Sequence, residues 1–171
     1  GNFGDRAGNF AVQNSDLVFS AGSRLRIRQV GFNCKGWARQ AYTIVNDIDE
    51  NELKKPTLHV SLPVHADCRE LFKAMLKILE NEKTPVWQGG GPGIKGMNWA
   101  DTCKYWKNKY PVCREGFLKE DDSRPADVYA FIHEIGLRAK ENQLVVVGNG
   151  SACVVGGHSY IIKKGQRFIS N

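Results

Sequence analysis

Residues 42–49 read Tyr42-Thr-Ile-Val-Asn-Asp-Ile-Asp49, and this stretch decides the fold. Its apolar and β-branched residues favour a strand, which ends where the acidic residues begin. An earlier apolar run at residues 16–22, closed by a glycine, is typical of a parallel strand that is buried on both faces. A third strand is predicted at residues 57–60. Strands separated by connections of this length predict an α/β fold.

Two segments that each combine predicted strands with predicted helices follow each other along the chain. Residues 84–98 include Gly89-Gly-Gly-Pro-Gly93 and lack periodicity, so we predict a linker there. It would join a domain at residues 1–83 to the incomplete start of a second domain at residues 99–171. A helix is predicted from Asp67 to Asn81, where apolar residues recur at helical spacing. The second segment predicts helices from Asn98 and from Pro125, and strands at residues 144–147 and 166–170.

The composition narrows the classes of function. The chain has 171 residues, of which 42% are hydrophobic, enough for about one domain with a core. The longest apolar run falls far short of the ~20 residues of a membrane span, so a membrane partner is not expected. The net charge of +6 is spread over both halves, which favours small anionic ligands over nucleic acid. Five widely spaced cysteines indicate unpaired thiols and a cytoplasmic protein.

The sequence Gly148-Asn149-Gly150-Ser151 follows a predicted strand directly. Open α/β sheets bind ligands at the carboxyl ends of their strands. Successive N–H groups in a glycine turn can hold an anion, and the start of a helix behind them adds partial positive charge. The pattern therefore predicts a phosphate or diphosphate site, and an ordinary strand-to-helix turn is the alternative.

Two further groups of charged residues could bind a nucleotide. Asp47, Asp49 and Glu52 end a strand, where a carboxylate can hold the hydroxyls of a ribose, although Asp49 could merely cap the next turn. If the chain were extended, Arg24, Arg26 and Arg28 would point the same way, toward a polyanion or toward solvent on an edge strand.

No set of catalytic or metal-binding residues is evident. The four histidines are isolated from one another and from the cysteines. A GxSxG nucleophile motif is absent from the sequence as well. The candidate site residues are therefore all ligand-binding ones.

Several motifs together resemble one family. The stretches are GNFGDRAGNFAVQNSDLVFSAGSR (1–24), AYTIVNDIDENELKK (41–55), VHADCRELF (64–72), PADVYAFIHEIGLRAKENQLVVVGNGSACVV (125–155) and KKGQRFISN (163–171). In this order they resemble thiamine-diphosphate-dependent acetolactate synthases. The resemblance implies part of a central Rossmann-like parallel sheet, followed by the first βα elements of the C-terminal domain that binds thiamine diphosphate.

The resemblance also implies ligand-binding residues. In the second domain, the diphosphate of the thiamine cofactor would lie against Gly148, Asn149, Gly150 and Ser151. Many members hold FAD in the central domain, and the matching positions are Phe3, Gly4, Gly22, Arg24, Arg28, Asp47, Ile48, Glu52 and Asp67. Where FAD-binding members carry acidic residues, this chain has Arg26 and Ile27, a departure that argues against FAD, so a relative without FAD is the alternative.

The activity implied is that of a cytoplasmic transferase of branched-chain amino acid biosynthesis. Such an enzyme decarboxylates one 2-oxo acid and joins the product to a second. The resemblance places the activating glutamate in an N-terminal portion before residue 1 and the Mg²⁺ motif in a C-terminal portion after residue 171. It also implies a homo-oligomer. We therefore expect this chain to be inactive by itself. A non-catalytic module that binds FAD or ADP is the alternative.

Overall fold

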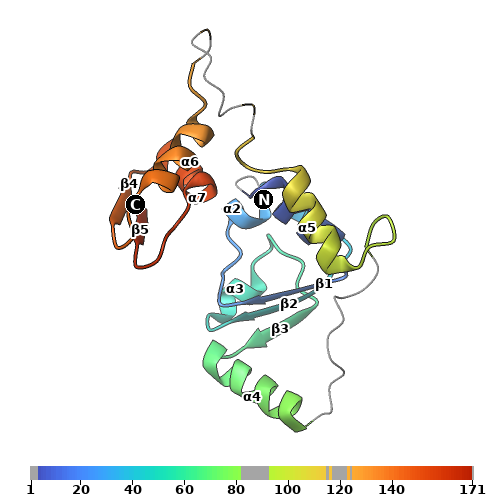
Figure 1. Ribbon diagram of the computed structural model, residues 1–171. Helices are drawn as coiled ribbons and strands as arrows, with labels where there is room; N and C mark the ends of the chain where they lie inside the picture. Colours follow the sequence, from blue (N-terminus) through green and yellow to red (C-terminus); the bar gives the residue numbers. More distant parts are fainter. Residues whose placement is uncertain (1–3, 82–92, 115, 117–122, 124, 171) are drawn as a thin grey trace. The chain divides into compact units, whose positions relative to one another are not determined.

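The computed structural model describes residues 4–81, 93–114, 116, 123 and 125–170 (Figure 1). The chain forms two compact units, residues 1–109 and residues 110–171. Each unit combines helices with a parallel sheet, which confirms the α/β fold and the partial Rossmann-like sheet. The two units are described separately below.

The first unit is built on a three-stranded sheet in the order β1-β2-β3. Its strands are β1 (Leu17–Ala21), β2 (Tyr42–Asp47) and β3 (Leu62–His65), and both pairs are parallel. The strand predicted at residues 57–60 is wrong, because β3 begins five residues later. Ser61 fixes this register: its Oγ accepts from Thr43 N at 3.0 Å, and its own N–H donates to Thr43 O at 3.0 Å.

The described part of the first unit has six helical segments besides these strands. They are α1 (Arg6–Asn14), α2 (Ile27–Val30), the 3₁₀ turn η1 (Cys34–Gly36), α3 (Glu50–Lys54), α4 (Cys68–Asn81) and α5 (Trp99–Lys109). The predicted starts of two helices are confirmed by their caps. Asp67 Oδ1 accepts from Arg69 N at 2.7 Å before α4, and Asn98 Oδ1 accepts from Asp101 N at 2.9 Å before α5.

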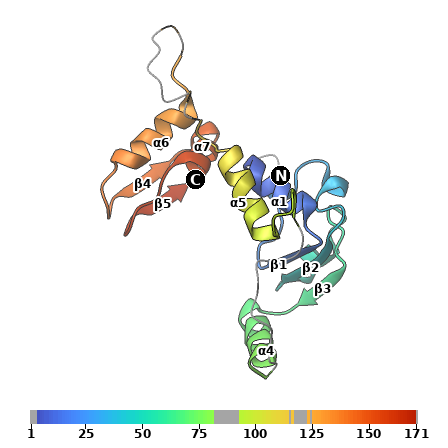
Figure 2. The ribbon, with the colours of Figure 1, turned by 45° about the vertical axis from the view of Figure 1, so that its right-hand side comes forward.

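Helix α5 belongs to the first unit, whereas the sequence placed it in the second domain. It lies beside α1 (Figure 2), where the ring centroids of Phe10 and Trp106 are 5.8 Å apart. Residues 84–92 of the expected linker lie outside the described residues. Residues 93–98 form a turn on α5, in which Gly93 N donates to Met97 O at 2.9 Å and Ile94 N donates to Thr102 Oγ1 at 3.1 Å.

The core of the first unit lies on one face of its sheet. Leu25, Val30, Val45 and Leu53 form it, with Trp37 and Leu58 packed against them. Side chains alternate between the two faces of a strand. On the opposite face Leu17 is 52% exposed, and α4 contacts Phe19 through Phe72, with ring centroids 6.4 Å apart. The prediction that β1 is buried on both faces is therefore wrong for the described part of the chain.

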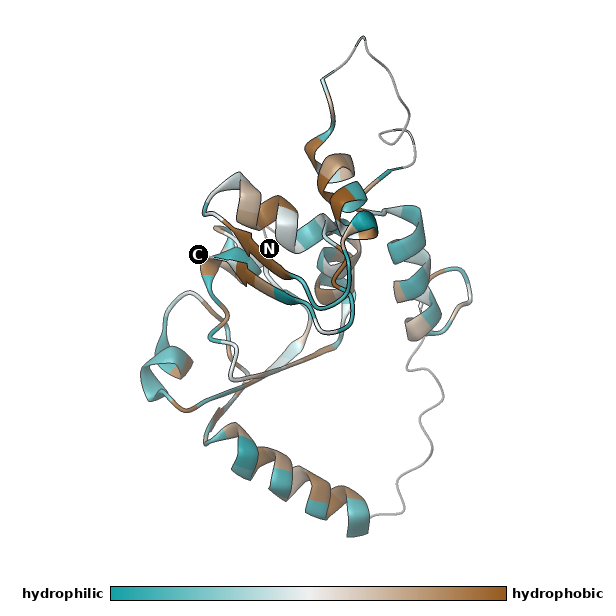
Figure 3. Ribbon diagram, turned by 60° about the vertical axis from the view of Figure 1, so that its left-hand side comes forward, coloured by the Kyte–Doolittle hydropathy of each residue, from teal (hydrophilic) through white to brown (hydrophobic). Residues whose placement is uncertain are grey.

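The second unit contains α6 (Val128–Arg138), β4 (Leu144–Val147), α7 (Ser151–Ser159) and β5 (Arg167–Ser170). Strands β4 and β5 are parallel, and the strand predicted at residues 144–147 is confirmed. The helix predicted from Pro125 begins later, at a cap in which Asp127 Oδ1 accepts from Ala130 N at 2.9 Å. Helix α7 covers one face of the pair, and the hydrophobic ribbon of β4 is visible in Figure 3.

Two predictions from composition can be compared with the fold. All five cysteines lie in the described part of the chain and are free thiols, as predicted. Over the same residues, every helix is too short or too polar to cross a membrane.

Candidate functional site

The carboxyl ends of the three strands in the first unit meet at one edge. Gly22 follows β1 with φ +61°, and its N–H donates to Asn46 O at 2.9 Å. Ala66, which follows β3, donates its N–H to Asp47 O at 3.3 Å. This edge brings together most of the nucleotide-site residues predicted in this half of the chain: Gly22, Arg24, Asp47, Ile48, Glu52 and Asp67.

A buried asparagine supports this edge. Asn46 is fully buried, and its Nδ2 donates to Val64 O at 2.9 Å and to Ala66 O at 2.8 Å. Its Oδ1 accepts from Cys68 Sγ at 3.0 Å. The side chain therefore connects the end of β2 to β3 and to the start of α4. Sequence reasoning missed this role, for which the signal is a polar residue that closes an apolar strand.

Arg24, Glu52 and Lys55 form a charged cluster above the edge. Arg24 Nε donates to Glu52 Oε1 at 2.8 Å, and the Arg24 guanidinium also makes an ion pair with that carboxylate. Lys55 Nζ lies 2.9 Å from Glu52 Oε2 and donates to the carbonyl oxygens of Arg24 and Leu25. The Glu52 side chain is only 17% exposed, so one carboxylate holds two cations beside the core. Lys55 was not predicted, although its spacing of three residues from Glu52 in α3 suggests such a pair.

The backbone between β1 and α2 is strained, and it is not extended. Arg24 has φ +58° and Leu25 has φ +43°, conformations that cost non-glycine residues free energy. Leu25 is only 7% exposed, so its burial in the core offsets this cost. Arg26 then caps α2, and Arg28 lies inside that helix. The prediction that the three arginines form an extended row is therefore wrong, because a turn and a helix interrupt the segment in which they alternate with other residues.

The acidic residues after β2 have separate roles. Asp47 is 6% exposed, and its Oδ1 accepts from Asp49 N at 3.0 Å. Asp49 caps α3 by accepting from Asn51 N at 2.9 Å, so the alternative that it is a capping residue is confirmed. Ile48 is exposed, and its carbonyl lies 2.9 Å from His65 Nε2. The hydrogen bond to Glu52 raises the pKa of Arg24, and Asp47 and Asp49 add to this effect by their charges.

We expect the charge on Glu52 to depend most on Lys55. The hydrogen bonds from Lys55 and then from Arg24 lower the pKa of Glu52. Because the folded-state pKa lies below the unfolded value of about 4.3, the cluster stabilises the fold fully above that pH. The stabilisation is lost as the pH falls through the lowered pKa.

A carboxyl ¹³C NMR titration measures this pKa directly. Lys55→Met raises the pKa of Glu52 toward its ordinary value, and Arg24→Met raises it less. Lys54→Met is the matched control, because Lys54 lies 2.6 Å from Glu50 and supports the lowered pKa of that residue instead. A Glu52 pKa that does not change in Lys55→Met contradicts the assignment.

The second unit carries the predicted glycine turn at the carboxyl end of β4. Gly150 precedes α7 with φ +82° and ψ −140°, a conformation that is essentially restricted to glycine. Asn149 Oδ1 accepts from Gly150 N at 2.7 Å, and the α-helical pattern then starts with Val154 N, which donates to Gly150 O at 3.3 Å. Among the described atoms, a Cβ placed on Gly148 or Gly150 meets nothing within 4 Å. The turn therefore leaves space for a ligand at the first turn of α7.

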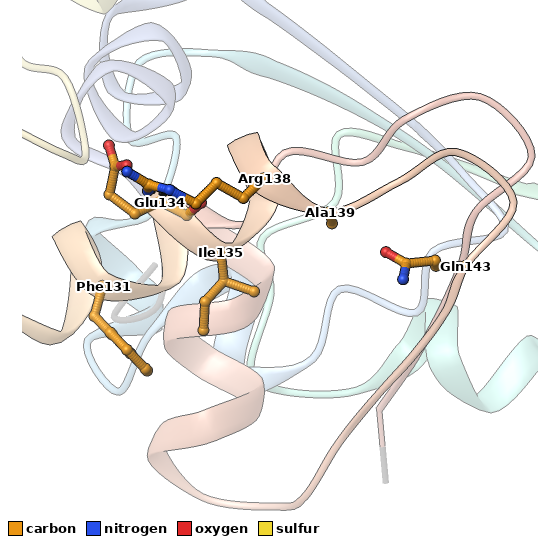
Figure 4. Close-up of a pocket in the computed structure, with 6 residues that line it drawn as sticks. All are labelled: Phe131, Glu134, Ile135, Arg138, Ala139 and Gln143. Carbon is orange, nitrogen blue, oxygen red and sulfur yellow. Dashed lines mark hydrogen bonds and ion pairs between the residues drawn. The ribbon is translucent and has the colours of Figure 1, made fainter.

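A pocket of about 480 Å³ lies elsewhere in the second unit. It is formed by one face of α6 and by the segment before β4 (Figure 4), with Phe131, Glu134, Ile135, Arg138, Ala139 and Gln143 as its lining. Glu134 and Arg138 form an ion pair within it. Gln143 directly precedes β4, so the pocket lies at the amino end of the strand. It is distinct from the glycine turn, which follows the carboxyl end.

The other predicted residues of the first unit are Phe3, Gly4 and Arg28. Phe3 is outside the described residues. Gly4 precedes α1, and its carbonyl accepts from Asn9 Nδ2 at 3.2 Å. Arg28 is a residue of α2. Residues 148–151 belong to the second unit.

Comparison with known proteins adds no relative: no model of a protein family matches the chain, and no curated protein matches it.

Proposed function

We propose that this chain is the cofactor-holding part of a thiamine-diphosphate-dependent enzyme that resembles acetolactate synthase. The parent enzyme would decarboxylate a 2-oxo acid and join the product to a second one. The observation that carries the proposal is the glycine turn at residues 148–151, which opens a helix directly after a parallel strand. The order of the two α/β units along the chain also agrees with the resemblance.

The residues of the turn fit a diphosphate group. The space above Gly148 and Gly150 allows close approach to the backbone. The first N–H groups of a helix have no partner within the helix, so those that open α7 can donate to an anion at this turn. Ser151 adds an exposed hydroxyl at the first position of the helix. When bound, thiamine diphosphate supplies the electron sink for decarboxylation. The role of these residues is to bind and orient the diphosphate, and the Mg²⁺ ligands would come from outside residues 1–171.

The proposal is tested by calorimetric titration of the chain with thiamine diphosphate and Mg²⁺. Gly150→Ala forces a side chain into a conformation with φ +82°, so we expect the affinity to fall about tenfold or more. Gly157→Ala is the matched control, because Gly157 lies inside the helix that Gly150 precedes and has open space around it. The affinity of this variant stays that of the wild type. The proposal is contradicted if the wild type and the two variants bind with equal affinity, or if the wild type gives no heat of binding.

A second candidate function is supported by the carboxyl edge of the first unit. There Arg24 lies beside Glu52 and within the electrostatic influence of Asp47, an arrangement of cation and carboxylates that suits the phosphates and hydroxyls of a nucleotide. The chain would then be a non-catalytic module that binds FAD or ADP. In the same calorimetric experiment, binding of FAD or ADP that Arg24→Met weakens, without binding of thiamine diphosphate, favours this second candidate.

A further inference from the structure

A tyrosine in the first unit lies between two lysines, far along the chain from every residue of the proposed sites. Tyr105 is a half-buried residue of α5. Lys95 Nζ lies 3.3 Å from the Tyr105 hydroxyl oxygen and 5.0 Å from the centroid of its ring. Lys109 Nζ lies 5.4 Å from the same centroid. The phenol therefore has an ammonium group supplied by the preceding turn and another supplied by the next turn of its own helix.

The backbone holds this arrangement together. The turn that carries Lys95 is closed by Met97 N, which donates to Ile94 O at 3.0 Å. It is fixed to α5 where Ile94 N donates to Oγ1 of the fully buried Thr102. Lys109 follows Tyr105 by four residues, the spacing at which helical side chains are neighbours. Asp101, one turn earlier, pairs with Lys104 at 3.2 Å.

Two ammonium groups change the chemistry of a phenol. They favour the phenolate over the neutral hydroxyl, and hydrogen bonds from Lys109 and then Lys95 lower the pKa of Tyr105. A phenolate is a much better nucleophile than a phenol, so a larger phenolate fraction means faster attack on an electrophile. Neither the residues of the glycine turn nor those of the nucleotide site take part in this effect on Tyr105.

We propose that Tyr105 is a nucleophilic phenol and a site of covalent modification by electrophiles of the sulfonyl or acyl class. With an aryl sulfonyl fluoride, the phenolate oxygen attacks sulfur, an S–O bond forms and the S–F bond breaks. The bonding electron pair leaves with fluoride, and the phenolic proton passes to solvent. Nothing is oxidised or reduced, and no co-reactant is needed.

The test measures labelling of the whole chain by an aryl sulfonyl fluoride at one mildly alkaline pH, with peptide mapping by mass spectrometry. Tyr42 is the internal reference, because its side chain is 52% exposed and exposure alone favours it over the half-buried Tyr105. We expect Tyr105 to react faster than Tyr42. Lys95→Met and Lys109→Met each slow the Tyr105 reaction by about fivefold, as expected for the loss of one charge beside a half-buried phenol.

Lys104→Met is the matched control, since Lys104 lies on the same helix and pairs with Asp101. It leaves the Tyr105 rate unchanged, and circular dichroism of each variant shows that the total helix content is that of the wild type. The proposal is overturned if Tyr42 reacts faster than Tyr105, if the label is found on Lys95 or Lys109 in place of the tyrosine, or if both lysine variants react at the wild-type rate.

Discussion

Replacing Asn46 with leucine lowers the free energy of unfolding of the first unit by about 3 kcal/mol. The Asn46 amide donates to Val64 O and Ala66 O, and its oxygen accepts from the Cys68 thiol, all at a fully buried position. Leucine has a similar size but cannot donate, so two carbonyl oxygens lose their partner inside the protein. Leaving a buried polar group without a hydrogen bond costs about 1–3 kcal/mol each.

Native-state hydrogen exchange of the β2 amides measures this loss within the first unit alone. Asn81→Leu is the matched control. The Asn81 side chain also donates to a backbone oxygen, Lys77 O at 2.8 Å, but it does so at an exposed position. There water replaces the lost partner, and the change stays within about 0.5 kcal/mol. Equal effects of the two substitutions would show that Asn46 does not hold the edge together.

Replacing Gly136 with alanine destabilises the second unit by about 2 kcal/mol. Gly136 is buried in α6, where a Cβ would lie 2.6 Å from the backbone N of Ile161 and 3.4 Å from its Cα. Backbone atoms cannot rotate away as a side chain can, so α6 must move from the segment that follows α7. This cost exceeds the gain of about 1 kcal/mol that alanine usually brings to a helix interior.

Replacing Gly157 in α7 with alanine is expected to have the opposite effect on the stability of the second unit. Among the described atoms, a Cβ at Gly157 meets nothing within 4 Å, so Gly157→Ala should stabilise the second unit by about 0.5–1 kcal/mol. Hydrogen exchange of the β4 and β5 amides compares the two variants directly. The packing described for α6 is contradicted if both glycines respond to alanine in the same direction.

Strands and helices with strong local signals could be predicted from the sequence. Residues 144–147 are four apolar residues followed by glycine, and they form β4 with the same bounds. Helices α4 and α5 start at the capping residues that the sequence indicated, because an Asp or Asn side chain satisfies the first N–H groups locally.

Features set by tertiary contacts could not be predicted in this way. The register of β3 depends on hydrogen bonds between Ser61 and Thr43, which are eighteen residues apart. Helix α5 joins the first unit through aromatic contacts with α1, more than ninety positions earlier in the chain. The turn at Arg24 and Leu25 exists because the buried Leu25 and the bonds from Lys55 offset its backbone strain. None of these interactions leaves a local pattern.

Only the part of the candidate site that follows from strand topology could be predicted from the sequence. Residues after strand ends converge in a parallel sheet, so the meeting of Gly22, Asp47 and Glu52 at one edge follows from topology. The pairing of Glu52 with both Arg24 and Lys55 depends on a turn whose conformation the sequence pattern did not reveal.

The most direct test of the proposed function is an amide NMR titration of the chain with thiamine diphosphate and Mg²⁺. We expect the largest chemical-shift changes on residues 148–151 and on the first turn of α7, which directly follows them. The amides at the carboxyl edge of the first sheet should keep their positions. Unchanged signals at residues 148–151, or changes centred on Gly22 and Asp47, would contradict the proposed function.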